Sequence, residues 1–181
     1  MPKASSVRTD GSPDGFVNPR SLRAQISPDG TTRLVVYVPP DELRERHLLL
    51  LRALGTPLSL RYVQLTDRAT GALPRPLTFV RMDIPADEVL AALDAAADLV
   101  WHDGRHQLWV RGRFGEQVVL DELGVLYCYP DDPTFRDALA DLSTSPAVGM
   151  DGRDYVKVEF LAHADALETA FIERLGLVRW G

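Results

Sequence analysis

The spacing of hydrophobic and polar positions becomes regular after residue 30 and predicts a mixed α+β domain over residues 31–181. Short apolar or alternating runs predict strands, and apolar positions at helical spacing between acidic starts and glycine stops predict helices. The expected order in the first half is strand 33–38, helix 41–55, strand 58–65, loop 66–76, strand 77–84 and helix 85–99.

The second half of the chain has a weaker pattern of shorter elements. We expect a β-meander between residues 99 and 129, and then helix 130–142, loop 143–153, strand 154–161 and helix 163–177. The strand–helix–strand–strand–helix–strand order over 33–111 predicts a ferredoxin-like βαββαβ start. The fold class is therefore α+β, with a mixed, mostly antiparallel sheet, the meander and two further helices.

Residues 1–30 are rich in Ser, Pro, Gly and Asp and contain few apolar positions. Such a composition cannot bury enough apolar surface to offset the entropy lost on ordering. We therefore expect a flexible N-terminal tail, or an arm that orders only against another surface.

The stretch VWHDGRHQLWV (100–110) contains two histidines four residues apart. Asp103–Gly104 is typical of a two-residue hairpin turn, and in that register side chains alternate between the two sheet faces. His102 and His106 then point to opposite faces and cannot bind one metal ion. Trp109 shares the more polar face with His102, Arg105 and Arg111.

An aromatic ring beside arginines is the composition enriched at protein–protein interfaces. The candidate binding residues are therefore Trp109, Arg111, Arg105 and His102. In the alternative interpretation Trp109 is buried beneath a helix that covers this face, as large aromatic residues usually are.

Composition and charge make several classes of function less favoured. The formal net charge is −6, which gives no general attraction to nucleic acid or anionic lipid. We find no apolar run long enough to span a membrane and no secretion signal, so a bacterial-type cytoplasmic protein is expected. The single cysteine, Cys128, excludes an internal disulfide and is expected to be a buried structural thiol.

Motifs for catalysis, phosphate binding or metal binding are missing from the sequence, so no catalytic residue, cofactor or metal is expected. This favours a non-catalytic protein-binding domain of adaptor, regulatory or immunity type, with a protein partner whose identity and stoichiometry the sequence leaves open.

Two alternatives remain open at this stage. A small enzyme could assemble a site across the meander from His102 or His106 with Asp121, Tyr127 or Tyr129. The stretch TFVRMD (78–83), with Tyr37, weakly indicates an RNA-binding ferredoxin-like domain, although the glycine and basic residues expected before Phe79 are missing.

Overall fold

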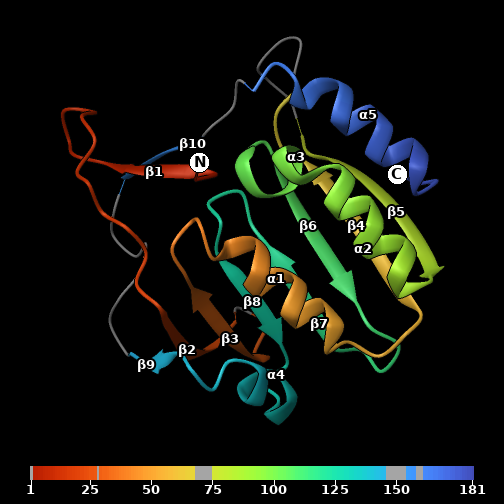
Figure 1. Cartoon of the computed structure of the whole chain (residues 1–181), viewed down its shortest axis with the longest axis horizontal. Helices are drawn as coiled ribbons and strands as arrows, with labels where there is room; N and C mark the ends of the chain where they lie inside the picture. Colours follow the sequence, from red (N-terminus) through yellow and green to blue (C-terminus); the bar gives the residue numbers. More distant parts are fainter. Residues whose placement is uncertain (1, 28, 68–74, 146–153, 158–160) are drawn as a thin grey trace.

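The computed structural model describes residues 2–27, 29–67, 75–145, 154–157 and 161–181 (Figure 1). This part of the chain forms a nine-stranded sheet, a separate two-stranded sheet and five helices, which confirms the α+β class. The helices are α1 (Leu43–Arg52), α2 (Ala86–Ala95), α3 (Ala97–His102), α4 (Pro133–Ala138) and α5 (Ala164–Arg174).

The large sheet has the strand order β11-β5-β4-β6-β7-β8-β3-β2-β9, and the small sheet pairs β1 with β10. The strands are β1 (Ala4–Val7), β2 (Ser21–Ile26), β3 (Thr32–Tyr37), β4 (Leu58–Gln64), β5 (Leu77–Ile84), β6 (His106–Arg111), β7 (Gln117–Leu120), β8 (Leu126–Tyr129), β9 (Ser143–Thr144), β10 (Asp154–Lys157) and β11 (Val178–Trp180). Neighbouring strands are antiparallel, except that β9 runs parallel to β2.

The ferredoxin-like start is not found in this topology. A ferredoxin-like domain would pair β3 with strands of the same βαββαβ unit, but β3 lies between β8 and β2. The three meander strands β6, β7 and β8 separate β3 from β4, and β2 occupies the other edge of β3. The strands that pair with β3 in place of the expected ones are therefore β8, from the meander, and β2, from the segment predicted to be a tail.

The prediction of a flexible N-terminal tail is wrong for the residues that the structure describes. Within residues 2–27, β1 pairs with β10 and β2 pairs along its whole length with β3. Leu22 and Ser21 are buried by this pairing, whereas Ala24 and Ile26 are exposed. The few apolar positions are sufficient because backbone hydrogen bonds to β3 supply most of the order.

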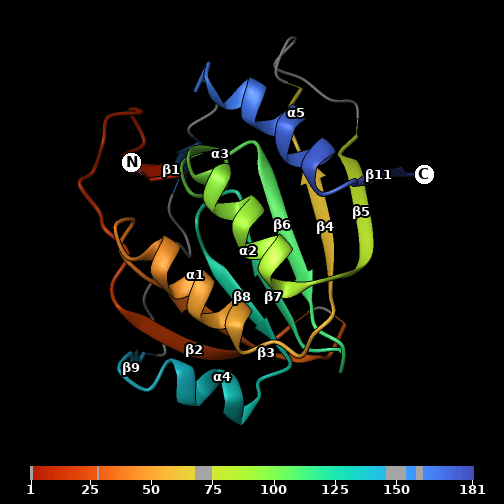
Figure 2. The same cartoon turned by 45° about the vertical axis from the view of Figure 1, so that its right-hand side comes forward.

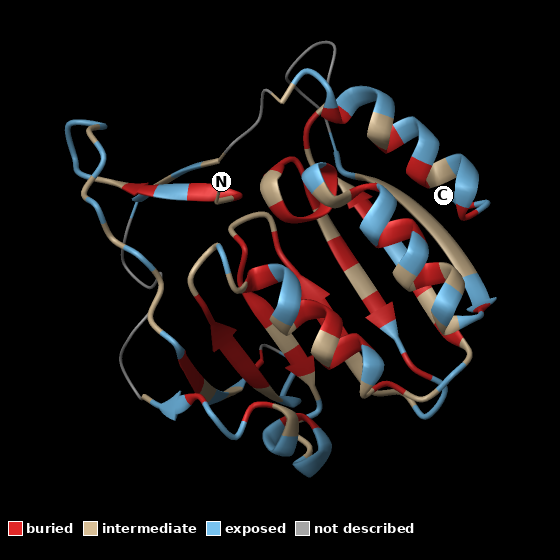
Figure 3. Ribbon diagram, in the orientation of Figure 1, coloured by how far each residue is buried: buried red, intermediate tan, exposed pale blue. Residues whose placement is uncertain are grey.

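Helices α1, α2, α3 and α5 cover one face of the large sheet (Figures 1 and 2). The main core lies between these layers, and Figure 3 shows buried positions along the facing strands and helices. Its members include Leu34, Leu60, Leu108 and Leu126 from the sheet and Leu50, Leu93, Trp101 and Phe171 from the helices. Among the described residues no helix combines the length and apolar character needed to cross a membrane.

The opposite sheet face has only a small apolar cluster, formed by Val35, Tyr37 and Val125 with Leu123 and Tyr127. No residue of the described helices belongs to this cluster. Elsewhere on this face Arg61, Met82 and Arg111 are exposed, whereas Val63 and Val119 are buried.

Candidate functional site

Arginine and aromatic side chains are in register across the sheet face opposite the helices. Direct cross-strand neighbours on β4, β6, β7 and β8 are Arg61, Trp109, Val119 and Tyr127. Because side chains alternate along a strand, Arg111 lies on the same face as Trp109. We call this surface the arginine–aromatic face; its main residues are Arg33, Arg61, Met82, Trp109, Arg111, Gln117, Tyr127, Tyr129 and Trp180.

Trp109 has two exposed arginines beside it on this face: Arg61 directly opposite on β4 and Arg111 two residues further along β6. The guanidinium of Arg61 is 5.3 Å from the centroid of the Trp109 ring, a cation–π distance. The indole Nε1 of Trp109 donates a hydrogen bond to Gln107 Oε1 (3.2 Å), which fixes the orientation of the ring. Arg61 and Arg111 form no ion pair with any described residue, so both charges are available to a ligand.

A depression of about 480 Å³ borders Trp109. Its lining combines the two arginines with Val80, Met82 and Trp180, of which Met82 and Trp180 are 65% and 71% exposed. Exposed apolar side chains grouped beside charges are a feature of binding surfaces. A second depression of about 450 Å³ shares Trp109, Arg111 and Gln117 with the first and extends the face toward Tyr129.

The other half of the face is held together by Arg33. Its guanidinium lies 4.6 Å from the ring centroid of Tyr127 and 5.6 Å from that of Tyr129. It also donates hydrogen bonds to the Tyr129 hydroxyl and to Gln25 Oε1. Arg33 is therefore committed to internal contacts, in contrast to Arg61 and Arg111.

Asp121 supports this half from the β7–β8 connection. Its carboxylate accepts hydrogen bonds from the backbone N–H groups of Leu123 (2.9 Å) and Val125 (2.8 Å) and from the Tyr127 hydroxyl (3.2 Å). Burial nevertheless raises the pKa of Asp121 to about 6, because desolvation of the charged form outweighs these bonds.

This raised pKa predicts a specific dependence of stability on pH. In the folded protein the carboxyl of Asp121 holds its proton up to about pH 6, whereas its ordinary pKa is 3.8. The protonated carboxyl therefore contributes its full share to the free energy of unfolding below about pH 4, and this contribution is lost as the pH rises through 6. The shift corresponds to up to about 3 kcal/mol. We expect Asp121→Asn, which keeps an acceptor oxygen without the charge, to remove this fall and to be more stable than the parent at pH 7. Urea unfolding from pH 3.5 to 8 measures the difference; parallel curves for the two proteins would contradict it.

The predicted hairpin at Asp103–Gly104 is wrong. Residues 97–102 form α3, so His102 is the last residue of a helix rather than a strand residue opposite Arg105. Leu99, Val100 and Trp101 are all buried, which a short helix enclosed by the protein permits and a half-exposed alternating strand does not.

Gly104 serves close approach rather than a hairpin turn. A Cβ atom at this position would lie 2.6 Å from the backbone oxygen of Lys3 and 3.1 Å from that of Glu122. The glycine therefore allows the N-terminal strand to contact the body of the protein.

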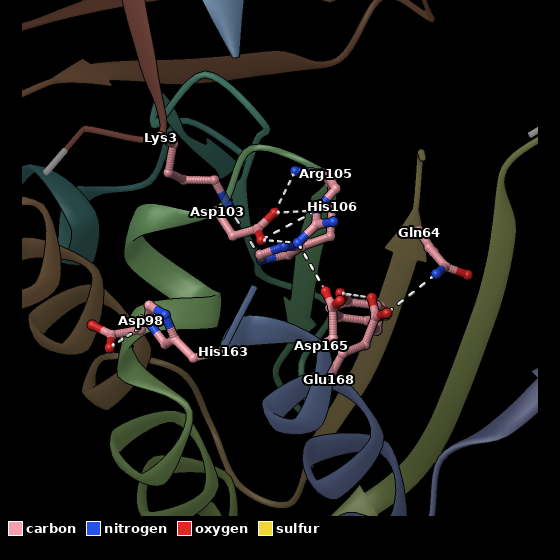
Figure 4. Close-up of polar contacts among 10 residues, drawn as sticks. Lys3, Gln64, Asp98, Asp103, Arg105, His106, His163, Asp165 and Glu168 are labelled. Carbon is pink, nitrogen blue, oxygen red and sulfur yellow. Dashed lines mark hydrogen bonds and ion pairs between the residues drawn. The ribbon is translucent and has the colours of Figure 1, made fainter. Parts of the chain in front are cut away.

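Of the four predicted binding residues, the structure brings only Trp109 and Arg111 together on the arginine–aromatic face. Arg105 is buried and pairs with Asp103 (Arg105 Nη2 to Asp103 Oδ2, 2.8 Å) and with Asp165 of α5 (3.1 Å; Figure 4). His102 is half-buried at the end of α3. Arg61, Met82 and Trp180 were missed, because only the strand pairing brings them beside Trp109.

The residues of the enzyme alternative are divided between the two sheet faces. His106 lies on the helix side, where its ring stacks on Tyr62 with centroids 5.0 Å apart, whereas Tyr127 and Tyr129 are on the arginine–aromatic face. Tyr62 in turn donates to Glu168 of α5. Glu168 also accepts from Gln64 (Figure 4). Among these residues, the Tyr127 hydroxyl donates a hydrogen bond to Asp121, a contact that involves neither histidine.

Other reactive groups add no catalytic arrangement in the described residues. Cys128 is fully buried, and burial raises the pKa of its thiol, which disfavours the nucleophilic thiolate. Within the described ranges no group of three or more His, Cys, Asp or Glu side chains is arranged to hold a metal ion.

The fold and the site together describe an α+β protein in which the described helices leave one sheet face uncovered. Comparison with protein-family models, with curated proteins and with solved structures finds no match to this chain.

Proposed function

We propose that this protein is a non-catalytic docking protein, of adaptor, regulatory or immunity type, whose arginine–aromatic face binds an acidic segment of a partner protein. The observation that carries the proposal is that Trp109 and the two exposed arginines Arg61 and Arg111 line one depression together with exposed apolar side chains. Trp and Arg are the residues most enriched at binding hot spots, and guanidinium groups form strong two-pronged bonds to carboxylates.

Charge supports the choice of an acidic partner. The chain carries a formal net charge of −6, yet Arg33, Arg61 and Arg111 gather on this face. The positive charge is therefore local, and it would attract acidic side chains while the rest of the molecule repels them. The apolar side chains of Met82 and Trp180 would receive hydrophobic residues of the same segment.

Single-stranded RNA is a second ligand to which aromatic and arginine side chains bind, but the geometry favours a protein. Base recognition by stacking needs an open ring face. On this surface Arg61 lies over one face of Trp109 and Arg33 over one face of Tyr127, so at most one face of each ring is left for a base to stack on.

Site-specific photocrosslinking in the native cell tests the proposal. We expect p-benzoylphenylalanine at Met82 to give an adduct with one protein, and the same group at Ala170, exposed on α5 on the helix side, to give none. The proposal is supported if the purified partner binds the purified chain and the crosslinked segment is acidic. An RNA adduct, or equal adducts from both positions, would overturn it.

A further inference from the structure

The side-chain amine of Lys3 is inserted into the body of the protein. Lys3, the third residue of the sequence, is 1% exposed. Its Nζ donates to the backbone oxygen of Val100 (3.1 Å) and to Nε2 of His106 (3.2 Å; Figure 4). The two acceptors come from the last turn of α3 and the first residue of β6.

The body of the protein supplies negative charge around this amine. The carboxylates of Asp121, Asp103 and Glu122 favour the ammonium form of Lys3, although burial is the larger effect and lowers the pKa of Lys3 to about 8. His47 faces the same region and is fully buried; its Nδ1 accepts from Trp101 Nε1 (3.2 Å). Burial and the charge of Lys3 lower the pKa of His47 to about 3, so it stays neutral beside the amine.

The segment that carries Lys3 is separate from the main sheet. β1 is hydrogen-bonded to β10 and to no strand of the nine-stranded sheet (Figure 1). We call residues 2–18 the N-terminal arm. A cavity of about 300 Å³ lies between this arm and the body of the protein, where it is lined by Val38, Leu43 and Leu123. The arm is therefore packed incompletely against the body, and the Lys3 amine is its most deeply inserted group.

We propose that the pocket formed by the Val100 carbonyl, His106 and the surrounding carboxylates is a binding site for a primary alkylammonium group, and that Lys3 fills it as an intramolecular ligand. The carbonyl and imidazole acceptors accept from two of the three N–H donors of such a group. Nearby carboxylates compensate its charge. A lysine side chain or an alkylamine from another molecule would occupy the same pocket once Lys3 is withdrawn.

Chemical rescue of Lys3→Ala tests the site. The substitution removes the atoms from Cγ to Nζ, which n-propylammonium replaces. We expect n-propylammonium to bind Lys3→Ala with a dissociation constant in the millimolar range, as its few atoms allow. It should raise the Tm by about 4 °C at ten times that constant. Calorimetry and thermal unfolding measure the two quantities.

Two control ligands and two control variants separate the pocket from general effects of the amine. 1-Propanol lacks the charge and propyltrimethylammonium lacks the N–H donors, so neither should stabilise Lys3→Ala. Lys3→Met fills the pocket with an uncharged chain, and Lys157→Ala removes the only other lysine, so n-propylammonium should stabilise neither variant. The proposal would be overturned if all three ligands stabilised Lys3→Ala equally, or if n-propylammonium did not stabilise it at all.

A measurement on the unaltered chain covers the case in which Lys3→Ala does not fold. The nitrogen-15 spectrum of lysine ammonium groups has at most two signals here, because the chain has two lysines. We expect a slowly exchanging Lys3 signal that is missing from Lys3→Met. A Lys3 ammonium that exchanges as fast as free lysine would contradict the buried site.

Discussion

Replacing Arg61 and Arg111 together by alanine is expected to weaken binding of the crosslinked partner by about 100-fold or more while leaving the fold unchanged. Arginines at the centre of an interface contribute about 2 kcal/mol or more each when truncated. Both side chains are exposed and neither is ion-paired within the described chain, so their removal costs the folded state little. Titration calorimetry measures the affinity, and thermal unfolding checks the fold.

The matched control for this double variant is Arg52→Ala with Arg174→Ala. Both residues are exposed at the ends of α1 and α5, in the layer on the other side of the sheet. The control changes the net charge by the same amount, so it separates local contact from long-range attraction. Equal losses for the two double variants would show that only net charge matters, and the arginine–aromatic face would lose its role.

The largest loss of stability is expected from Arg105→Ala. The side chains of Arg105 and Asp103 are 3% and 0% exposed, and their ion pair is 2.8 Å long. Removing the arginine takes away the ion-pair partner of a fully buried carboxylate, and breaking such a pair costs about 3–5 kcal/mol. It also removes the bond to Asp165 that ties α5 to the start of β6. Urea unfolding at pH 7 measures the change in the free energy of unfolding.

Arg44→Ala provides the comparison for Arg105→Ala. Arg44 pairs with Asp94 at a similar distance, 2.9 Å, but the side chains are 56% and 53% exposed. An exposed pair contributes about 1 kcal/mol or less. A loss at Arg105 no larger than that at Arg44 would mean that the buried pair is unimportant for stability.

The strands and helices with a strong apolar period could be predicted from the sequence. The expected strand 33–38 is β3 (Thr32–Tyr37), and the expected helix 41–55 contains α1 (Leu43–Arg52). β2 and β11 were missed because they lie near or at the edge of the sheet, where few side chains are buried. Both strands are ordered by backbone hydrogen bonds, which the pattern of side chains does not reveal.

The candidate site could be predicted only where one strand carries it. Trp109 and Arg111 share a face because side chains alternate along β6, and the sequence reveals this alternation. Arg61 joins them through the pairing of β4 with β6, which depends on the whole topology. Arg105 was predicted on the exposed face, but it is buried in an ion pair with Asp103. The pattern of apolar and polar positions does not indicate which charged residues are buried.

The position of the meander in the sheet affects how the chain folds as it is synthesised. The β2–β3 hairpin and the β4–β5 hairpin both leave the ribosome before residues 106–129, yet they meet only through β6, β7 and β8. Each nascent hairpin therefore exposes an unsatisfied edge until the centre of the sheet is made. Such late, long-range pairing slows folding and exposes strand edges to aggregation, so chaperone protection would matter most during this interval.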